Sequence, residues 1–441
     1  MITEKMNQRL TETGGQTPAG QLMRQYWQPV ALSDQLAGQR PVVPVEIMGE
    51  KLVLFRIQDG PDQGQLGLID RACPHRGVDL CYGRLETGGL RCPFHGFLFG
   101  HDGTCLEQPG EPGEKNHPRH FGQAAYPVIE RNGLILAYLG GDTPPALPEL
   151  DCFIAPSSHV FAFKGHLDCN WLQALEVGID PVHASFLHRY LEDESGADSY
   201  GRQFMDSSGE EEIPQTWLLR NYPAPQLSVR QTGYGLQIVA SRQLDEKRTH
   251  YRVTNQVFPN AIVIPMSRTM AITQWHIPID DRQCYWYAAF TSYSGPVDKA
   301  LMRAQRLELY QLPDYRPTRH RGNHWGYDPA EQESQTYTGM GMDINVHDQW
   351  AVESPGPLSN RSAEHLVSSD QAIARYRAML NRALRDLEAG EKGKLPLYKT
   401  GDQGLPGPAF ADMLEYQDRP AASWQNSYQQ LRQNADWEPE K

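Results

Sequence analysis

The sequence predicts an α+β protein in which a small all-β domain precedes a larger domain of helices beside an antiparallel sheet. Short β-type runs, separated by Gly and Pro, follow one another between residues 41 and 138. Further strand patterns joined by short turns occupy residues 226 to 293, as expected for an antiparallel sheet. Residues 373 to 387 carry apolar side chains at three- and four-residue steps, which predicts an amphipathic helix with Gly390 as its C-cap.

Changes in the sequence pattern divide the chain into three parts. Residues 1–25 are predicted to be an N-terminal helical segment, residues 26–145 the β domain, and residues 146–441 the larger domain with its C-terminal helix. The Gly- and Pro-rich segment 140–145 marks the second boundary, since domain boundaries fall where few contacts cross. Within the larger domain, residues 167–190 are predicted to be helical.

The overall composition narrows the classes of function. The chain has 441 residues, 39% hydrophobic and 22% charged, which is ordinary for a globular protein. A formal charge of −13 disfavours nucleic acid and anionic membranes as partners. We expect a cytoplasmic location without membrane contact, because neither a signal-peptide core nor a bilayer-length apolar run is seen. Seven cysteines, an odd number, favour metal ligation and free thiols over a disulfide framework.

A first metal site is predicted from two short segments, Cys73-Pro74-His75 and Cys92-Pro93-Phe94-His95. In a Rieske-type [2Fe–2S] centre, two cysteines hold one iron and two histidines hold the other, so two facing loops of this composition can supply all four ligands. A structural zinc site is the alternative, but such sites more often pair Cys with Cys and His with His in each half. We therefore predict a [2Fe–2S] cluster held by Cys73, His75, Cys92 and His95.

A second metal site is predicted further along the chain, where Asp180, His183 and His188 follow the pattern Asp-x2-His-x4-His. Two histidines and one carboxylate leave open positions on Fe(II), where dioxygen can bind beside a substrate. Asp180 is assigned another task, so the carboxylate ligand has to come from a distant part of the chain. The candidates are Asp343, Asp348 and Glu353. An alternative for Asp348 is that it simply begins a helix, where Asp is favoured in any case.

Both metal patterns resemble those of one enzyme family. The segment CPHRGVDLCYGRLETGGLRCPFHGFLFGHDGTC resembles the Rieske domain of aromatic ring-hydroxylating oxygenases. The segments DPVHASFLH and ESPGPLSNRSAEHLVSSD resemble the phthalate dioxygenase family, so that the resemblance covers nearly the whole chain. It implies Asp348 as the iron ligand and a helix-grip-like catalytic domain. It also implies a ring of identical subunits, either a homotrimer or a multiple of one.

The resemblance further implies a role for Asp180. In such rings the Rieske cluster of one subunit lies next to the mononuclear iron of its neighbour, and an aspartate bridges the two. Its carboxylate would accept hydrogen bonds from His183 and from His95 of the partner subunit, and would orient the ligand imidazole. Asn170, which begins the same segment, is predicted to belong to the catalytic site with Asp180.

An electron-transfer protein is the alternative from a different class. Respiratory Rieske proteins carry an additional cysteine in each cluster-binding loop, and the two form a disulfide. The loops of this chain lack such a pair, so Cys81 and Cys105 are predicted to be buried thiols. An electron carrier would also leave the second metal pattern unexplained. The chain has neither a G-x-G-x-x-G motif, a P-loop nor a plant-type cluster motif, so electrons are expected from a separate NAD(P)H-dependent reductase.

The expected substrate is a small aromatic acid of the phthalate type, oxidised with dioxygen by hydroxylation or dihydroxylation in the catabolism of aromatic compounds. O-demethylation of an aryl ether such as a methoxybenzoate is the alternative on the same motifs. A carboxylate substrate needs a cation, preferably a guanidinium, which can bind it in a bidentate manner. Arg242, at the end of the predicted strand GLQIVASR, is the first candidate and Arg252 the second.

Overall fold

The computed structural model describes residues 2–113, 122–141, 143–192, 213, 215–397, 408–418, 423–435 and 437. The chain splits into two compact units. The smaller unit contains Glu12–Pro145 and Ile277–Asp281, and the larger contains Met1–Thr11, Ala146–His276 and Arg282–Lys441. The predicted N-terminal segment 1–25 is thus divided between the two units, and it contains two helices, Glu4–Thr11 and Pro18–Met23. None of the helices in the described chain combines the length and apolar character needed to cross a membrane.

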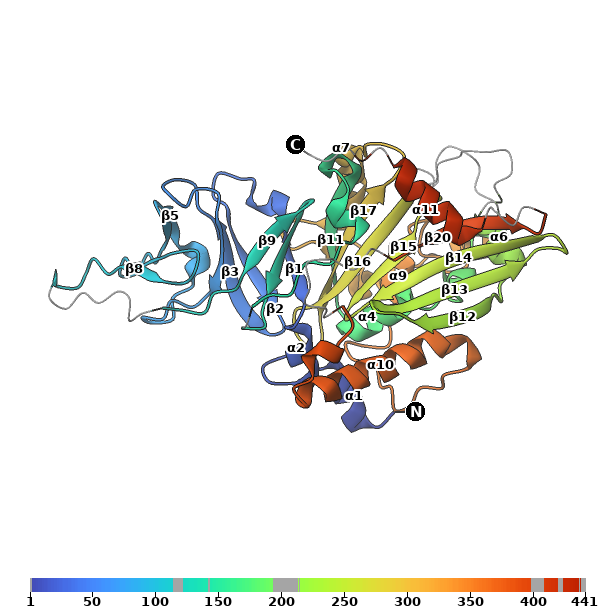
Figure 1. The fold of residues 1–441 in the computed structure, drawn as a ribbon, viewed down its shortest axis with the longest axis horizontal. Coiled ribbons are helices and arrows are strands. Elements are labelled where there is room, and N and C mark those ends of the chain that lie inside the picture. Colours follow the sequence, from blue (N-terminus) through green and yellow to red (C-terminus); the bar gives the residue numbers. More distant parts are fainter. Residues whose placement is uncertain are drawn as a thin grey trace. The chain divides into compact units, whose positions relative to one another are not determined.

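The described part of the smaller unit contains three small antiparallel sheets after helix α2 (Pro18–Met23) (Figure 1). The first sheet has the order β1 (Trp27–Leu32), β10 (Leu134–Tyr138), β9 (Val128–Arg131). The second consists of β2 (Val42–Ile47), β3 (Glu50–Arg56) and β4 (Leu66–Asp70). The third consists of β5 (Arg84–Glu86), β6 (Gly89–Arg91), β7 (Leu98–Phe99) and β8 (Cys105–Glu107). The predicted small all-β domain is therefore confirmed.

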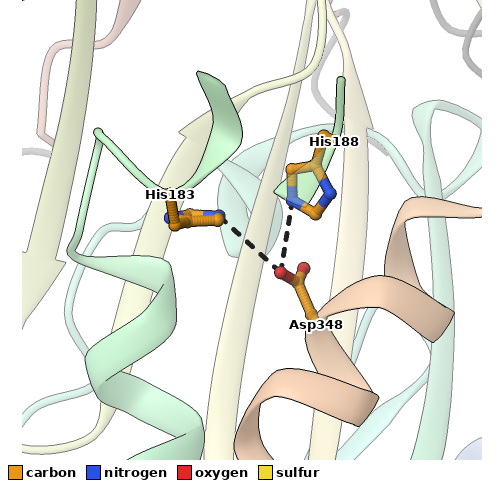
Figure 2. A group of neighbouring side chains, drawn as sticks. All are labelled: His183, His188 and Asp348. Carbon is orange, nitrogen blue, oxygen red and sulfur yellow. Dashed lines mark ion pairs between the residues drawn. The ribbon is translucent and has the colours of Figure 1, made fainter. Parts of the chain in front are cut away.

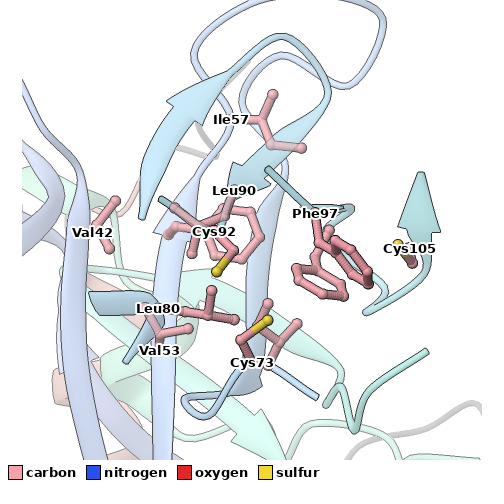
Figure 3. Close-up of a cluster of buried hydrophobic side chains, with 12 residues drawn as sticks. Val42, Val53, Ile57, Cys73, Leu80, Leu90, Cys92, Phe97 and Cys105 are labelled. Atoms are coloured by element: carbon pink, nitrogen blue, oxygen red, sulfur yellow. The ribbon is translucent and has the colours of Figure 1, made fainter. Parts of the chain in front are cut away.

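The core of the smaller unit surrounds the two cysteines of the first metal pattern (Figure 3). Apolar side chains of β3 and of the third sheet, together with Leu80, leave the solvent almost completely. Cys73 and Cys92 belong to this same buried cluster, as does Cys105. Burial of apolar surface stabilises a fold by about 25 cal/mol per Å². Because Cys73 and Cys92 are part of the buried core, the same packing that stabilises the domain also fixes the backbone beside both thiols.

The larger unit is built on an eight-stranded sheet. Seven of its strands follow the order β11 (Val160–Leu167), β17 (Cys284–Ser292), β16 (Met270–Pro278), β15 (Ala261–Pro265), β14 (Arg248–Val257), β13 (Gly235–Gln243), β12 (Gln226–Gln231), and the eighth strand pairs with β14 beside this path. The strands β12 to β16 form an antiparallel meander, as predicted. β15 pairs only with the last three residues of β14, and the first six pair with β20 (Ala411–Tyr416).

Helices of the larger unit pack on this sheet and on one another (Figure 1). They are α1 (Glu4–Thr11), α3 (Asp151–Ile154), α4 (Trp171–Gly178), α5 (Ala184–Leu187), α6 (Gln215–Asn221), α7 (Lys299–Leu309), α8 (Pro329–Ser334), α9 (Ile344–Glu353), α10 (Gln371–Glu388) and α11 (Trp424–Asn434). α4 contacts β15 and α9, and α10 contacts β13. α10 confirms the predicted amphipathic helix, and Gly390 follows it with a φ of +75°, which suits glycine at this position.

A buried ionic cluster ties α4 to α10. Glu176 accepts from Arg361 at 2.8 Å and from Arg377 at 2.6 Å, and Arg361 also donates to Asn7 of α1. Burial alone would raise the pKa of Glu176, but the two guanidinium groups outweigh it and hold the pKa below its ordinary value. The cluster fixes the helix that leads directly to the histidines of the second metal pattern.

Candidate active site

The two segments of the first metal pattern form a matched pair of loops. The N–H groups of Cys73 and Cys92 donate to the carbonyls five residues further on, at 2.9 and 2.8 Å. Gly77 and Gly96 donate back to the carbonyls of these cysteines, at 2.8 and 3.0 Å. Both glycines have a positive φ, +73° and +77°, which residues with a Cβ rarely adopt. Each loop therefore closes on itself and holds its cysteine and histidine in a fixed local geometry.

The loops bury their thiols and expose their imidazoles. Cys73 and Cys92 are 2% and 3% exposed, whereas His75 and His95 are exposed with ring centroids 4.4 Å apart. Burial, helped by the neighbouring Cys92, raises the pKa of Cys73 to about 11. Cluster binding therefore has to displace thiol protons. The arrangement suits a [2Fe–2S] cluster whose cysteine-bound iron is buried and whose histidine-bound iron faces outward.

Neither of the other two cysteines in this unit pairs. All seven cysteines lie in the described chain, and each is a free thiol. Cys105 is buried, as predicted, whereas Cys81 is only partly buried. Burial nevertheless raises the pKa of Cys81 to about 12, so this thiol stays protonated and unreactive at neutral pH.

In the larger unit, Asn170 is the N-cap of α4 rather than a residue of the reaction site. Its Oδ1 accepts from the N–H of Leu172 and its Nδ2 donates to the carbonyl of Thr11, both at 3.0 Å. The side chain is completely buried and does not line the cavity described below. The prediction that Asn170 is catalytic is therefore corrected: an Asn at this position stabilises the helix N-terminus.

The turn after α4 differs from the prediction in one respect. His183 Nδ1 does hydrogen-bond with Asp180, but the acceptor is the backbone carbonyl and not the carboxylate. Oδ1 of Asp180 instead accepts from the N–H of Val182 at 2.8 Å, an Asx turn that Pro181 favours. Because a carbonyl only accepts, Nδ1 of His183 carries the hydrogen, and its Nε2 is left with a free lone pair.

Figure 2 shows His183 and His188 facing Asp348, which projects from α9. Asp348 Oδ1 lies 3.6 Å from Nε2 of His183 and 3.2 Å from Nε2 of His188. Among the described residues this is the one group of three or more His, Cys, Asp or Glu side chains whose ligand atoms lie within 4.8 Å of one another. Oδ1 is buried and makes no hydrogen bond of good geometry. Three donor atoms that converge in this way fit a metal ion better than they fit one another.

The charges of the group also suit a divalent metal. Burial works to raise the pKa of Asp348, but His188 and His183 outweigh it and lower the pKa, so Asp348 is a carboxylate at neutral pH. Burial lowers the pKa of His183, which is therefore a neutral imidazole. Two imidazole nitrogens and one carboxylate oxygen on one side leave the other side open, as in non-haem Fe(II) oxygenases.

The two rival carboxylates have other partners. Asp343 is the N-cap of α9, where it accepts from the N–H of Asn345 at 2.8 Å, and it pairs with Arg306. Glu353 accepts from Trp325 at 2.8 Å, and burial raises its pKa. Asp348 itself lies in the middle of α9, so the alternative that it begins a helix is wrong.

A cavity of about 160 Å³ opens beside His183, His188 and Asp348 and has all three in its wall. Most of the wall is apolar, with side chains such as Ile179, Ile238, Ile264, Ile272, Met266 and Phe290. The polar wall residues besides the ligands include Arg252, Thr254, Gln274, His276 and Asn345. Burial lowers the pKa of His276 to about 4, so it is neutral at pH 7. Such a cavity binds a small apolar ring and orients it by a few polar contacts.

The two candidate arginines differ in their position relative to the cavity. Arg252 lines the cavity, donates to the carbonyl of Pro265 at 2.9 Å and forms an ion pair with Asp412. Arg242 does not line the cavity; its guanidinium donates to the carbonyl of Tyr222 at 2.9 Å and lies 3.4 Å from Ser185 Oγ. Burial lowers the pKa of Arg242 to about 10.

A second and wider hollow, of about 600 Å³, also has Asp180 and His183 in its wall. Its other wall residues include Phe186, Tyr327 and Tyr337, each more than two-fifths exposed. Exposed apolar side chains grouped around a hollow are typical of an interaction surface. The turn that carries Asp180 and His183 therefore borders both the cavity and this hollow.

Two features of the site escaped the sequence analysis. His347, immediately before Asp348, is completely buried and lies against His188. Gln274 and His276 alternate along β16 toward the cavity. The only sequence signal for His347 was its position next to a candidate ligand. For Gln274 and His276 there was none, because in a sequence a polar strand residue that faces a cavity looks the same as one that is hydrogen-bonded in the core.

One chain thus combines a domain suited to hold a [2Fe–2S] cluster with a domain that presents an open metal site in a cavity, which defines a redox metalloprotein with separate sites for electron transfer and for reaction. The profile of the Rieske [2Fe–2S] domain matches residues 26–123, and that of the LigXa C-terminal domain like family matches residues 138–406. The chain belongs to the oxygenase components of the Rieske-type oxygenases.

Similar proteins support this assignment. The phthalate 4,5-dioxygenase oxygenase subunit of Pseudomonas putida is 32% identical over 92% of this chain and 90% of its own length. The 5,5′-dehydrodivanillate O-demethylase oxygenase subunit of a Sphingobium species is 28% identical over 90% of this chain and 83% of its own length. The crystal structure of dicamba monooxygenase bound to dicamba has a TM-score of 0.56 at 19% identity, covering 83% of this chain and 98% of that chain, which shows the common fold.

Proposed function

We propose that this oxygenase component uses dioxygen to hydroxylate or dihydroxylate a small aromatic acid, in the catabolism of aromatic compounds. The observation that carries the proposal is that the three-ligand group lies in the wall of an apolar cavity. Fe(II) bound by His183, His188 and Asp348 would supply the reductive activation of dioxygen. The apolar wall would hold the aromatic ring and exclude water from the reacting atoms.

Arg252 is our candidate for binding the carboxylate of the substrate. It is the one arginine or lysine among the described residues of the cavity wall. Its charge is already partly compensated by Asp412, so it suits one carboxylate better than two. An aromatic acid with a single carboxylate near the metal is therefore favoured over one that needs both carboxylates bound.

Electrons would enter through the smaller unit. In our proposal Cys73 and Cys92 hold the buried iron of the cluster, and His75 and His95 hold the exposed one. Exposed imidazoles offer a path by which electrons arrive and leave. The chain carries no nucleotide-binding motif, so a separate NAD(P)H-dependent reductase would supply the electrons.

We further propose a homotrimer, or a multiple of one, in which the hollow beside Asp180 receives the Rieske loops of a neighbouring subunit. The support is the grouping of exposed Phe186, Tyr327 and Tyr337 around the side of the metal-binding turn that carries Asp180. Asp180 would then connect His183 with His95 of the partner subunit, through its backbone carbonyl on the near side and its carboxylate on the other.

Mixing of two inactive variants tests the exchange between subunits. Cys92→Ala removes a cluster ligand, and Asp348→Ala removes a mononuclear ligand, so each homo-oligomer should be inactive with reductase present. Co-expressed and purified as hybrids, the two should regain activity, because an intact cluster of one subunit would face an intact metal site of the next. Hybrids of confirmed mixed composition that remain inactive would contradict the exchange.

O-demethylation is the second candidate, favoured by the O-demethylase among the similar proteins. The same cavity would hold a methoxybenzoate with its methyl group toward the metal site. Formaldehyde and a phenol would then appear in equal amounts, whereas dihydroxylation of a benzoate gives a dihydrodiol and no formaldehyde. Product analysis on benzoate, phthalate and methoxybenzoate panels separates the two reactions.

Metal analysis with turnover tests the whole proposal. Anaerobically purified protein should contain about three irons and about two acid-labile sulfides per chain, from one cluster and one mononuclear site. With a reductase and NAD(P)H it should consume dioxygen and form a hydroxylated aromatic product. Protein with a full cluster and a metal-loaded second site that oxidises none of the aromatic substrates would overturn the proposed function.

A further inference from the structure

His347 is buried between His188 and the loop that precedes α9, and it contacts both through hydrogen bonds. Its Nε2 lies 2.7 Å from the carbonyl oxygen of Gly341, and its Nδ1 lies 3.4 Å from Nδ1 of His188. The two imidazole rings are inclined by only 23°, with centroids 5.6 Å apart. His347 is completely shielded from solvent. Its two nitrogens therefore have these partners and no access to water.

The direction of the two hydrogen bonds follows from the acceptor at the far end. The carbonyl of Gly341 only accepts, so Nε2 of His347 carries a hydrogen. The buried ring has a carbonyl and an imidazole as its partners, and a buried charge would need an ionic partner, so the ring is neutral and its Nδ1 is an acceptor. His188 must then donate through Nδ1–H. This leaves the lone pair of His188 on Nε2, the atom that lies 3.2 Å from Asp348.

The acceptor carbonyl is itself held in place. The N–H of Gly341 donates to Glu331 Oε1 at 2.8 Å, and the residue has a φ of +83°. Arg319 donates to the carbonyl of the preceding residue, Met340, at 2.5 Å. A side chain on Gly341 would be strained by the positive φ, and its Cβ would displace the Arg319 guanidinium, so glycine suits this position.

We propose that His347 is a positioning residue, which fixes the tautomer and ring orientation of His188 so that Nε2 is presented to the metal. The chain of contacts runs from the Gly341 carbonyl through His347 to His188. His347 accepts the Nδ1–H of His188 in the same way that the carbonyl of Asp180 accepts the Nδ1–H of His183. Partners of this kind also raise the basicity of a ligand imidazole. The inference rests on the proposed metal site and goes beyond it, because α9 would supply one ligand and also orient another.

The replacements Met and Gln form a matched pair for a test. Both have a volume close to that of the imidazole, but only Gln offers an acceptor for His188 and a donor for Gly341. We would measure the dissociation constant of Co(II) at the second site by equilibrium dialysis, in protein that retains its cluster. His347→Met should weaken Co(II) binding by about 10- to 100-fold, and His347→Gln by no more than about threefold. His159→Met is the control, because His159 is a buried histidine of the same unit that contacts Ser158 instead.

Pulsed EPR of Cu(II) at the same site provides a readout that a merely structural role would not move. The remote nitrogen of a ligand imidazole reports its hydrogen bond, so one of the two remote nitrogens should change in His347→Met and return toward wild type in His347→Gln. Asp348→Ala supplies the baseline for Co(II) or Cu(II) bound elsewhere.

The outcomes separate this inference from the proposed function. Wild-type protein that binds Co(II) no better than Asp348→Ala would overturn the metal site itself. Wild-type binding together with unchanged affinity and unchanged remote nitrogens in His347→Met would overturn the role of His347 alone. Equal losses in the Met and Gln variants, with wild-type melting temperatures, would also overturn it. If His347→Met does not fold, the pair Leu and Asn repeats the comparison.

Discussion

The two regions that carry the predicted metal ligands are built in opposite ways. In the smaller unit, the predicted cluster ligands lie between residues 73 and 95, on two loops that close through their own hydrogen bonds. In the larger unit, the ligands lie on two segments around residues 188 and 348, and only the packing of α4, α5 and α9 brings them together. The difference teaches that the first site depends on local backbone geometry, whereas the second depends on how distant helices are anchored.

The largest expected effect separates the two sites. Asp348→Ala should lower product formation by about 10³-fold or more, because the metal loses its carboxylate. Iron content should fall from about three to about two per chain, while sulfide content and the visible spectrum of the cluster stay unchanged. Cys92→Ala should give the opposite result, with loss of sulfide and retention of Co(II) binding at the second site. Loss of the cluster in Asp348→Ala would show that the sites are not independent.

Glu176→Gln tests the dependence of the second site on distant packing. It leaves two buried guanidinium groups without their shared partner, which should destabilise the larger unit by about 3–5 kcal/mol. The folded-state pKa of Glu176 is lowered, so its contribution is fully present above the ordinary value of 4.5 and is lost as pH falls through the folded-state pKa. The difference between wild type and variant should therefore be full at pH 7 and shrink below about pH 4.5.

Denaturant unfolding at several pH values measures this difference, with cluster absorbance as an internal reference for the smaller unit. Glu364→Gln is the control, because Glu364 pairs with Arg377 at the surface side and is about one-third exposed. It should cost at most about 1 kcal/mol. A pH-independent gap between wild type and Glu176→Gln would contradict the assigned charge state.

Replacing the arginine of the cavity should have a smaller and more selective effect. Arg252→Gln should raise KM for an aromatic acid by about tenfold or more, since a hydrogen bond to a charged group contributes about 1.5–3 kcal/mol. KM for the corresponding methyl ester should stay the same. The double variant Arg252→Gln/Asp412→Asn also removes the carboxylate that would otherwise keep only His250 as its ionic partner, and it should show the same selectivity. Arg242→Gln should lower the melting temperature and leave KM unchanged, and the reverse pattern would restore Arg242 as the substrate contact.

The smallest effect concerns the two loops of the cluster site. A Cβ on Gly77 would meet no atom within 4 Å, so Gly77→Ala should cost only the strain of a positive φ, about 1–2 kcal/mol. A Cβ on Gly96 would lie 2.8 Å from Pro109 Cγ, so Gly96→Ala should cost more. Thermal bleaching of the cluster absorbance measures both. Equal losses of thermal stability in the two variants would mean that Pro109 moves away from the new Cβ at no cost.

The same contrast decides how much the sequence could predict. The spacing of Cys73, His75, Cys92 and His95 was informative because a local site leaves its pattern in consecutive residues. The helix α10 and the meander from β12 were likewise predictable from periodicity. Asp343, Asp348 and Glu353, by contrast, lie on or next to one helix, and only packing decides which of them meets the histidines.

The two arginines show the same limit on a sheet. Arg252 lies opposite Ala240 in the register of β13 and β14, and Arg242 lies opposite His250. Both therefore project from the same face, two residue pairs apart along the strands, with the pair Ser241–Tyr251 between them. The alternation of side chains along a strand predicts which face of the sheet each arginine lies on. It does not predict that Arg252 reaches the cavity while Arg242 lies against Ser185 of α5 and Tyr222 after α6.

The pairing of β20 with β14 has a consequence for synthesis of the enzyme. The edge of β14 between residues 248 and 253 has no strand partner until residues 411 to 416 have left the ribosome. Asp412, which holds the cavity arginine, arrives on that same late strand. The wall of the cavity that contains Arg252 therefore reaches its final form only after β20 has been made, long after strands β11 to β17.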